Sequence, residues 1–177
     1  MISINKNKRT NIVVQGLGFV GSAMAVAIAS RRNEKGENLF NVTGIDLNNS
    51  SGNDKINKIN SGTFPFETKD RQLINETKKC IEQGNLSATS DISIYSKADI
   101  IVVNINCDLI VENGERKIQL GNFIDGIKSI ASKIKEHTLI IVESTIPPGT
   151  CEKIIYPIFL ESFKKRKLNI KNFFLAH

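Results

Sequence analysis

The 177 residues predict an α/β fold built on a doubly wound parallel sheet. Apolar runs of strand length alternate with segments of helical periodicity along nearly the whole chain, as successive right-handed βαβ crossovers require. The run IIVV at 100–103 is apolar throughout, which is typical of a strand covered on both faces. A glycine-rich turn follows the first apolar run. These three observations predict the fold class.

Each element follows from its local pattern. Pro147-Pro148-Gly149 ends extended structure, Thr150 is expected to cap the next helix, and Pro157 is expected to kink that helix or end its first section. The expected strands are 11–15, 41–46, 99–105, 137–143 and 172–176; the expected helices are 20–30, 53–60, 69–83, 123–134 and one that begins near 150, with a loop at 106–121.

Length and composition limit the class of protein. The chain is long enough for one domain with a real core and short for two, so we expect a single domain over 1–177. No apolar stretch approaches the roughly 20 residues that span a bilayer, so no membrane association is expected. Cys80, Cys107 and Cys151 are unrelated in spacing, and the chain has only 2 histidines. These cysteines and histidines predict neither a disulfide framework nor a metal site. The reducing cytoplasm is the compartment that best fits the free cysteines.

The positive charge is concentrated at the two ends. The net charge is +6, but residues 10–162 carry 16 positive and 18 negative side chains. A nucleic-acid surface places basic residues on the folded body. We therefore expect no nucleic-acid partner.

The turn Gly16-Leu17-Gly18-Phe19-Val20-Gly21 has the pattern G-x-G-x-x-G, between an expected strand and an expected helix. In such a turn the first glycine permits the tight bend, the second admits a pyrophosphate and the third lets the helix approach the strand. Asp46 ends the second strand, where a carboxylate can bind the ribose hydroxyls of a dinucleotide. No arginine follows it, which favours NAD over NADP. A purely structural turn and a solvated strand-end carboxylate are the simpler alternatives.

Three further segments follow the turn in order: KINSGTFPFE at 58–67, GNLSATSD at 84–91 and ESTIPPGT at 143–150. With GLGFVG they resemble the N-terminal half of the UDP-glucose/GDP-mannose dehydrogenase family, over about residues 11–176. The resemblance implies a Rossmann-type NAD-binding domain. It implies an enzyme that oxidises the C6 alcohol of a UDP- or GDP-sugar to a carboxylate in two NAD-dependent steps, for polysaccharide biosynthesis.

The resemblance also implies roles for particular residues. Gly16 to Gly21 and Asp46 look like cofactor contacts. Ser144 and Thr145 look like the segment that passes the nicotinamide, and Thr145 matches the threonine that helps to position the catalytic water. Without the resemblance, both hydroxyls would be interpreted as backbone caps before the Pro-Pro turn.

Two features depart from the family pattern. INCD stands at 105–108 where V-P-T-P or V-N-T-P is usual, so Asn106 and Cys107 are expected to line the cofactor on an altered loop. As a nucleophile Cys107 competes with a simpler role, that of a small apolar filler. The family's catalytic cysteine, its dimer-forming helix and its sugar-nucleotide domain would all lie beyond residue 177. We therefore expect this chain to bind NAD without catalysing the oxidation, and the full-length enzyme to be a homo-oligomer.

Two other functions fit a domain of this kind. One is a dehydrogenase of small 3-hydroxy acids, which lacks the motifs at 58–67 and 143–150. The other is a dinucleotide-binding module without catalysis, which a fold alone never excludes.

Overall fold

A computed structural model describes residues 9–112 and 115–177. The strands are β1 Thr10–Gln15, β2 Phe40–Ile45, β3 Leu86–Thr89, β4 Ile100–Val103, β5 Asp108–Glu112, β6 Glu115–Gln119, β7 Leu139–Val142 and β8 Phe174–Ala176. The α-helices are α1 Phe19–Ala29, α2 Ser50–Asn60, α3 Arg71–Glu82, α4 Gly121–Ala131 and α5 Tyr156–Lys165, and the shorter helices are η1 Ile92–Lys97, η2 Cys151–Ile155 and η3 Ile170–Asn172.

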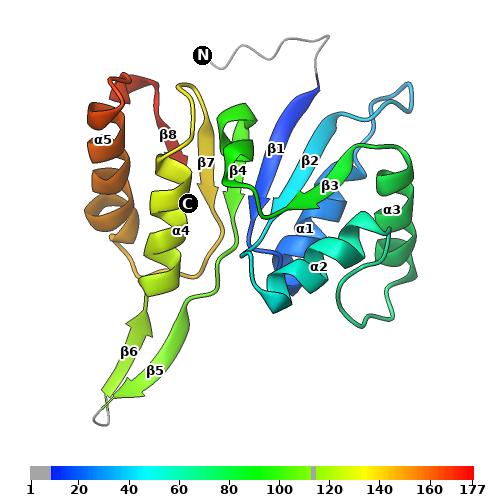
Figure 1. Ribbon diagram of the computed structural model, residues 1–177, viewed down its shortest axis with the longest axis horizontal. Coiled ribbons are helices and arrows are strands. Elements are labelled where there is room, and N and C mark those ends of the chain that lie inside the picture. Colours follow the sequence, from blue (N-terminus) through cyan, green and yellow to red (C-terminus); the bar gives the residue numbers. More distant parts are fainter. Residues whose placement is uncertain (1–8, 113–114) are drawn as a thin grey trace.

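Six strands form one parallel sheet in the order β3-β2-β1-β4-β7-β8. The chain builds outward from β1 to β3 on one side and from β4 to β8 on the other, so the direction of winding reverses between β1 and β4. This is the doubly wound sheet that the sequence predicts, and the fold class is confirmed (Figure 1).

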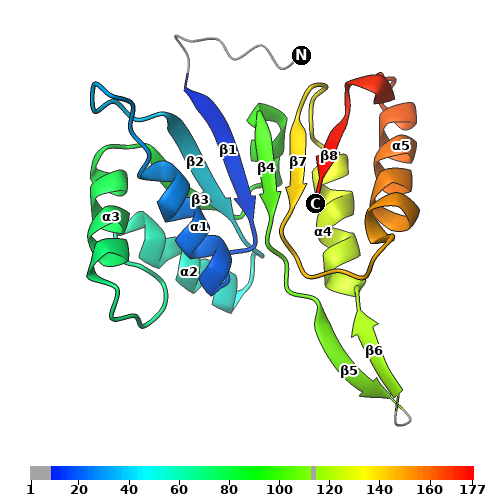
Figure 2. The same cartoon turned by 180° about the vertical axis from the view of Figure 1, so that it is seen from behind.

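The strands are buried on both faces because alternate residues belong to two separate cores. Val13 and Ile101 pack with α4 and α5, whereas Val14 and Val102 pack with α1, α2 and α3. The first group of helices covers one face of the sheet and the second group covers the other, as the two opposite views show (Figure 2). Among the helices of the described residues, none combines the length and the apolarity needed to cross a membrane.

The expected loop at 106–121 is wrong, because β5 and β6 pair as an antiparallel hairpin that projects from the body (Figure 1). Asn113-Gly114, between the two strands in the sequence, is a strong hairpin signal. The edge strand β3 was also not expected, since only 4 residues form it and they alternate in burial.

The helix after the Pro-Pro turn has two sections, as Pro157 predicts. Residues Cys151–Ile155 form a widened π turn, and regular α5 begins at Tyr156 with proline in its first turn. Thr150 makes no side-chain capping bond, so its expected role as a cap is wrong. Its backbone is already helical at φ −60° and ψ −40°, whereas a capping residue needs an extended backbone.

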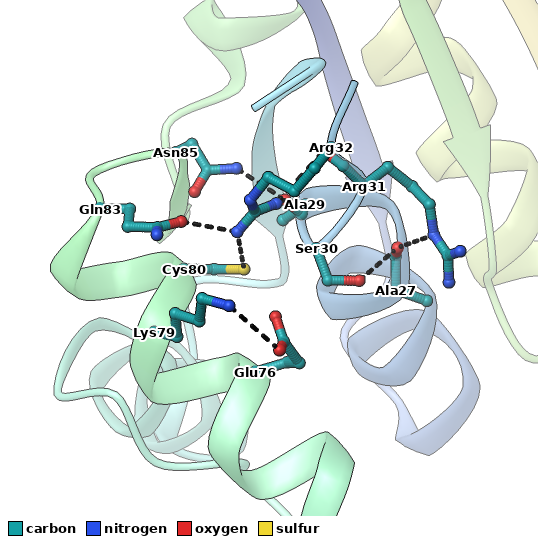
Figure 3. A network of polar contacts seen from close by, with 10 residues as sticks. All are labelled: Ala27, Ala29, Ser30, Arg31, Arg32, Glu76, Lys79, Cys80, Gln83 and Asn85. Atoms are coloured by element: carbon teal, nitrogen blue, oxygen red, sulfur yellow. Dashed lines mark hydrogen bonds and ion pairs between the residues drawn. The ribbon is translucent and has the colours of Figure 1, made fainter. Parts of the chain in front are cut away.

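Residues 31–38 connect α1 to β2 at the edge of the sheet opposite the glycine turn. The guanidinium of Arg32 anchors this connection by donating to the carbonyl of Ala29 at 2.7 Å and to Oε1 of Gln83 at 2.6 Å. The amide of Asn85 donates to the same carbonyl at 2.8 Å (Figure 3). The end of α1, the end of α3 and the start of β3 are thus joined through one carbonyl group.

Candidate cofactor-binding site

A cavity of about 540 Å³ lies where the winding of the sheet reverses. Its walls come from the carboxyl ends of β1, β2 and β4, from η1 and from α4. Ligands of doubly wound sheets bind at this place, because the loops that leave neighbouring strands there diverge to opposite faces. The size is that of an ordinary small-molecule site.

The glycine turn forms the floor of this cavity beside β1. Gly16 has φ +93°, and a Cβ on it would lie 2.4 Å from the carbonyl oxygen of Asn104. A Cβ on Gly21 would lie 1.9 Å from the carbonyl oxygen of Gly16. Neither position has room for a side chain. A Cβ on Gly18 would meet nothing within 4 Å, so the space above that residue is open to a ligand.

Helix α1 begins at the turn without a side-chain cap. Its N-cap is Gly18, and there is no acidic residue in the first turn. The first N–H groups of a helix lack partners within the helix and carry partial positive charge, which favours a bound phosphate. Phe19 and Val20, the first two helical residues, are 50% and 62% exposed. Leu17, by contrast, is buried beneath the turn.

Asp46 is held in the cavity by three donors. Its carboxylate accepts from the backbone N–H of Leu17 at 3.1 Å and of Leu47 at 2.7 Å. It also pairs with the ammonium of Lys55 on α2. The bond from Leu17 ties the acid to the glycine turn, so the turn and the carboxylate form one unit.

Lys55 is a site residue that the sequence reasoning missed. It lines the cavity, and its side chain is 19% exposed beside Asp46 at 11%. The search for a cation covered only the residues directly after Asp46, whereas Lys55 comes one turn and a half into α2. Helical spacing from Asn49, which caps α2 by accepting from Gly52 N–H at 2.8 Å, could have located it.

The other predicted residues occupy the ends of β4 and β7. Asn106 lines the cavity with Asn104 and Ile105. Cys107 is half-buried and packs against the core near α4 and α5, outside the cavity lining. A cofactor contact for Cys107 stays a prediction.

Ser144 and Thr145 follow β7 at the same edge of the sheet as the glycine turn. The hydroxyl of Ser144 is buried and donates to the carbonyl of Val103 at 3.3 Å, whereas Thr145 is exposed. Neither residue lines the cavity itself. Their expected roles at the nicotinamide therefore stay predictions.

Burial disfavours the reactive form of two of the three cysteines. Burial raises the pKa of the Cys80 thiol, and burial also raises the pKa of Cys151 at the start of the π turn. A raised pKa disfavours the thiolate, which is the nucleophilic form. In residues 9–112 and 115–177, no three His, Cys, Asp or Glu side chains are grouped as they would be around a metal ion.

Tyr95 closes the deep end of the cavity. Its side chain is only 1% exposed, and its hydroxyl donates to Oε1 of Gln15 at the end of β1. Burial raises the pKa of Tyr95 above its ordinary value of 10.0. Since the higher pKa belongs to the folded state, the stability that this phenol contributes is complete below about pH 10 and is lost as the pH rises beyond it.

An alkaline titration followed by tyrosinate absorbance is expected to show that Tyr95 ionises only together with unfolding, because burial opposes the charged phenolate in the folded chain. The variant Tyr95→Phe should lose the absorbance step that coincides with unfolding as followed by circular dichroism. An absorbance step that Tyr95→Phe removes, but that appears reversibly while the wild-type chain is still folded, would contradict the buried position of Tyr95.

A glycine turn at a helix N-terminus, a carboxylate on the adjacent strand and a cavity at the switch point of a parallel sheet together define a Rossmann-type dinucleotide-binding domain. The residues fit NAD: the space above Gly18 is open, and the carboxylate of Asp46 lines the same cavity at the end of the neighbouring strand. The chain belongs to the UDP-glucose/GDP-mannose dehydrogenase family, whose NAD-binding domain matches residues 10–176.

Individual relatives agree with this family. The UDP-N-acetyl-D-mannosamine dehydrogenase of Methanocaldococcus jannaschii is 32% identical over 157 residues, which are 87% of this chain and 33% of the relative. The solved structure of NDP-N-acetyl-D-galactosaminuronic acid dehydrogenase from Methanosarcina mazei is 26% identical with a TM-score of 0.82, and the match covers 96% of this chain and 34% of that one. GDP-mannose dehydrogenase from Pseudomonas aeruginosa shares the fold at a TM-score of 0.74 and 24% identity, over 93% of this chain and 34% of that one. The chain thus spans about a third of the length of these relatives.

Proposed function

We propose that this domain holds NAD for a nucleotide-sugar 6-dehydrogenase, and that the sugar is a UDP-linked N-acetylhexosamine. The observation that carries the proposal is the single unit formed by the glycine turn, Asp46 and Lys55 in a chain of this family. The named substrates of the curated relatives, UDP-N-acetyl-D-mannosamine and UDP-N-acetyl-D-glucosamine, support the choice of sugar.

In this reaction a primary alcohol becomes an aldehyde and then, after water adds, a carboxylate. NAD held in this cavity would supply the hydride acceptor, one molecule for each of the two steps. The chain's own residues place the cofactor: α1 directs its N–H groups at the pyrophosphate, and Asp46 accepts from the ribose hydroxyls. Thr145, exposed at the end of β7, is proposed to help position the water. Segments that correspond to the remaining length of the relatives are proposed to supply the nucleophile and the sugar site. The enzyme is proposed to be a cytoplasmic homo-oligomer.

Titration calorimetry of this chain with NAD and NADP is expected to give saturable binding that favours NAD. The same chain with NAD and UDP-N-acetyl-D-mannosamine is expected to form no NADH. A folded chain that binds neither dinucleotide would contradict the proposed site. NADH formation from the nucleotide sugar would show that the chain needs no further domain, and NADH formation from a small 3-hydroxy acid would favour the other class of dehydrogenase.

A further inference from the structure

The cavity also has lining residues with no assigned role. Two large apolar side chains line it from different segments, namely Leu47 after β2 and Ile92 at the start of η1. They are 62% and 41% exposed. Leu47 directly follows Asp46 in the chain, so a flat heterocycle attached to a ribose at Asp46 could cover apolar surface there.

Polar side chains line the same cavity from α4. They are Asn122, Asp125 and Ser129, and their spacing of three and four residues places them on one face of the helix. Gly126 lets α4 approach the segment that follows β4, because a Cβ there would lie 2.2 Å from Cδ1 of Ile105. The helix therefore packs closely against the segment that also carries Asn104.

The polar side chains that line the cavity differ in whether they have a bonding partner within the protein. Asp46 is neutralised by Lys55, and Ser129 is hydrogen-bonded to Tyr95. The carboxylate of Asp125 is exposed, and within the described part of the chain it makes neither a hydrogen bond nor an ion pair. An ionised carboxylate can only accept hydrogen bonds. It is thus the carboxylate in this cavity best suited to an N–H donor of a ligand.

We propose that Asp125 accepts a hydrogen bond from the exocyclic amine of the cofactor's adenine and so makes this domain selective for adenine over a 6-oxopurine. The inference rests on the proposed NAD site. Adenine presents an N–H₂ donor at position 6, whereas a 6-oxopurine presents an acceptor there. A carboxylate attracts the first and repels the second, and Leu47 and Ile92 enclose either ring equally well.

The test compares NAD with nicotinamide hypoxanthine dinucleotide, in which an oxygen replaces the adenine amine. Calorimetric titration of the wild-type chain is expected to show binding of NAD roughly tenfold tighter, as for one hydrogen bond to a charged group at an open site. Asp125→Asn should bring the two dissociation constants to within about twofold, because its amide can donate to the oxygen. Glu82→Gln, the same charge change on the exposed end of α3, is the matched control and should keep the tenfold preference.

The outcomes separate this inference from the proposed function. If neither dinucleotide binds, the NAD site itself is wrong and the inference falls with it. If NAD binds but the hypoxanthine analogue binds equally well, as it would if Asp125 met the ring N1–H instead, only the selectivity of Asp125 is overturned. An unchanged preference in Asp125→Asn overturns it too.

Discussion

Gly18→Ala and Gly21→Ala are expected to abolish or greatly weaken NAD binding for different physical reasons. A Cβ on Gly18 meets no protein atom within 4 Å, so the fold should lose less than about 1 kcal/mol of stability. The same Cβ would occupy the space of the pyrophosphate. Such a clash costs about 1–3 kcal/mol of binding free energy. The dissociation constant of NAD should therefore rise by roughly tenfold to hundredfold.

In Gly21→Ala the new Cβ overlaps the backbone oxygen of Gly16 at 1.9 Å, and no flexible side chain can move away. Helix α1 must shift, so the free energy of unfolding should fall by about 1–3 kcal/mol or more. Urea unfolding and NAD titration of both variants provide the check. Equal loss of stability in the two variants would show that the difference in available space is not what distinguishes these glycines.

Asp46→Ala is expected to weaken NAD binding by about 1–3 kcal/mol, the cost of losing a charged hydrogen-bond partner. The change removes the acceptor for the ribose hydroxyls and also releases the N–H groups of Leu17 and Leu47. It leaves the Lys55 ammonium without its partner, beside the place where NADP carries a 2′-phosphate. The preference for NAD over NADP should therefore narrow in this variant.

The double variant that combines Asp46→Ala with Lys55→Met should not gain affinity for NADP, because the Lys55 ammonium is no longer present beside the 2′-phosphate. Asp54→Ala, on the exposed side of α2, makes the same chemical change outside the cavity and should leave both affinities unchanged. Unchanged NAD affinity in a folded Asp46→Ala chain would remove Asp46 from the site. Circular dichroism would verify that each variant is folded.

The features around the cavity that can be read from the sequence are those set by local rules. Gly16 and Gly21 are recognisable because backbone contacts leave no alternative residue type, and the apolar strands because both faces of the sheet are covered. Lys55 and Asp125 could not be identified in this way. They reach the cavity through the packing of α2 and α4, which depends on the register of distant strands.

The predictions of a loop at 106–121 and of a helix cap at Thr150 are wrong, and the physical reasons are of another kind. Neither DLIVE at 108–112 nor ERKIQ at 115–119 alternates between polar and apolar residues, so the sequence there lacks the period of two that indicates a strand. At Thr150 the residue type suits a cap, but Pro147 to Gly149 already lead the chain into a helical backbone. Residue preference is a weaker determinant there than the geometry imposed by the preceding turn.

Residues 31–38 explain why Asp46 lies 30 positions after Gly16 and still lines the same cavity as the glycine turn. Both ends of this stretch are fixed, by α1 on one side and by the pairing of Thr10 with Phe40 on the other. Its length can vary without moving the acid, so a site of this kind is defined by strand register and not by a count of residues. Gly36, where a Cβ would touch nothing within 4 Å, is accordingly a point at which a fluorescent label or a peptide tag could be inserted far from the bound dinucleotide.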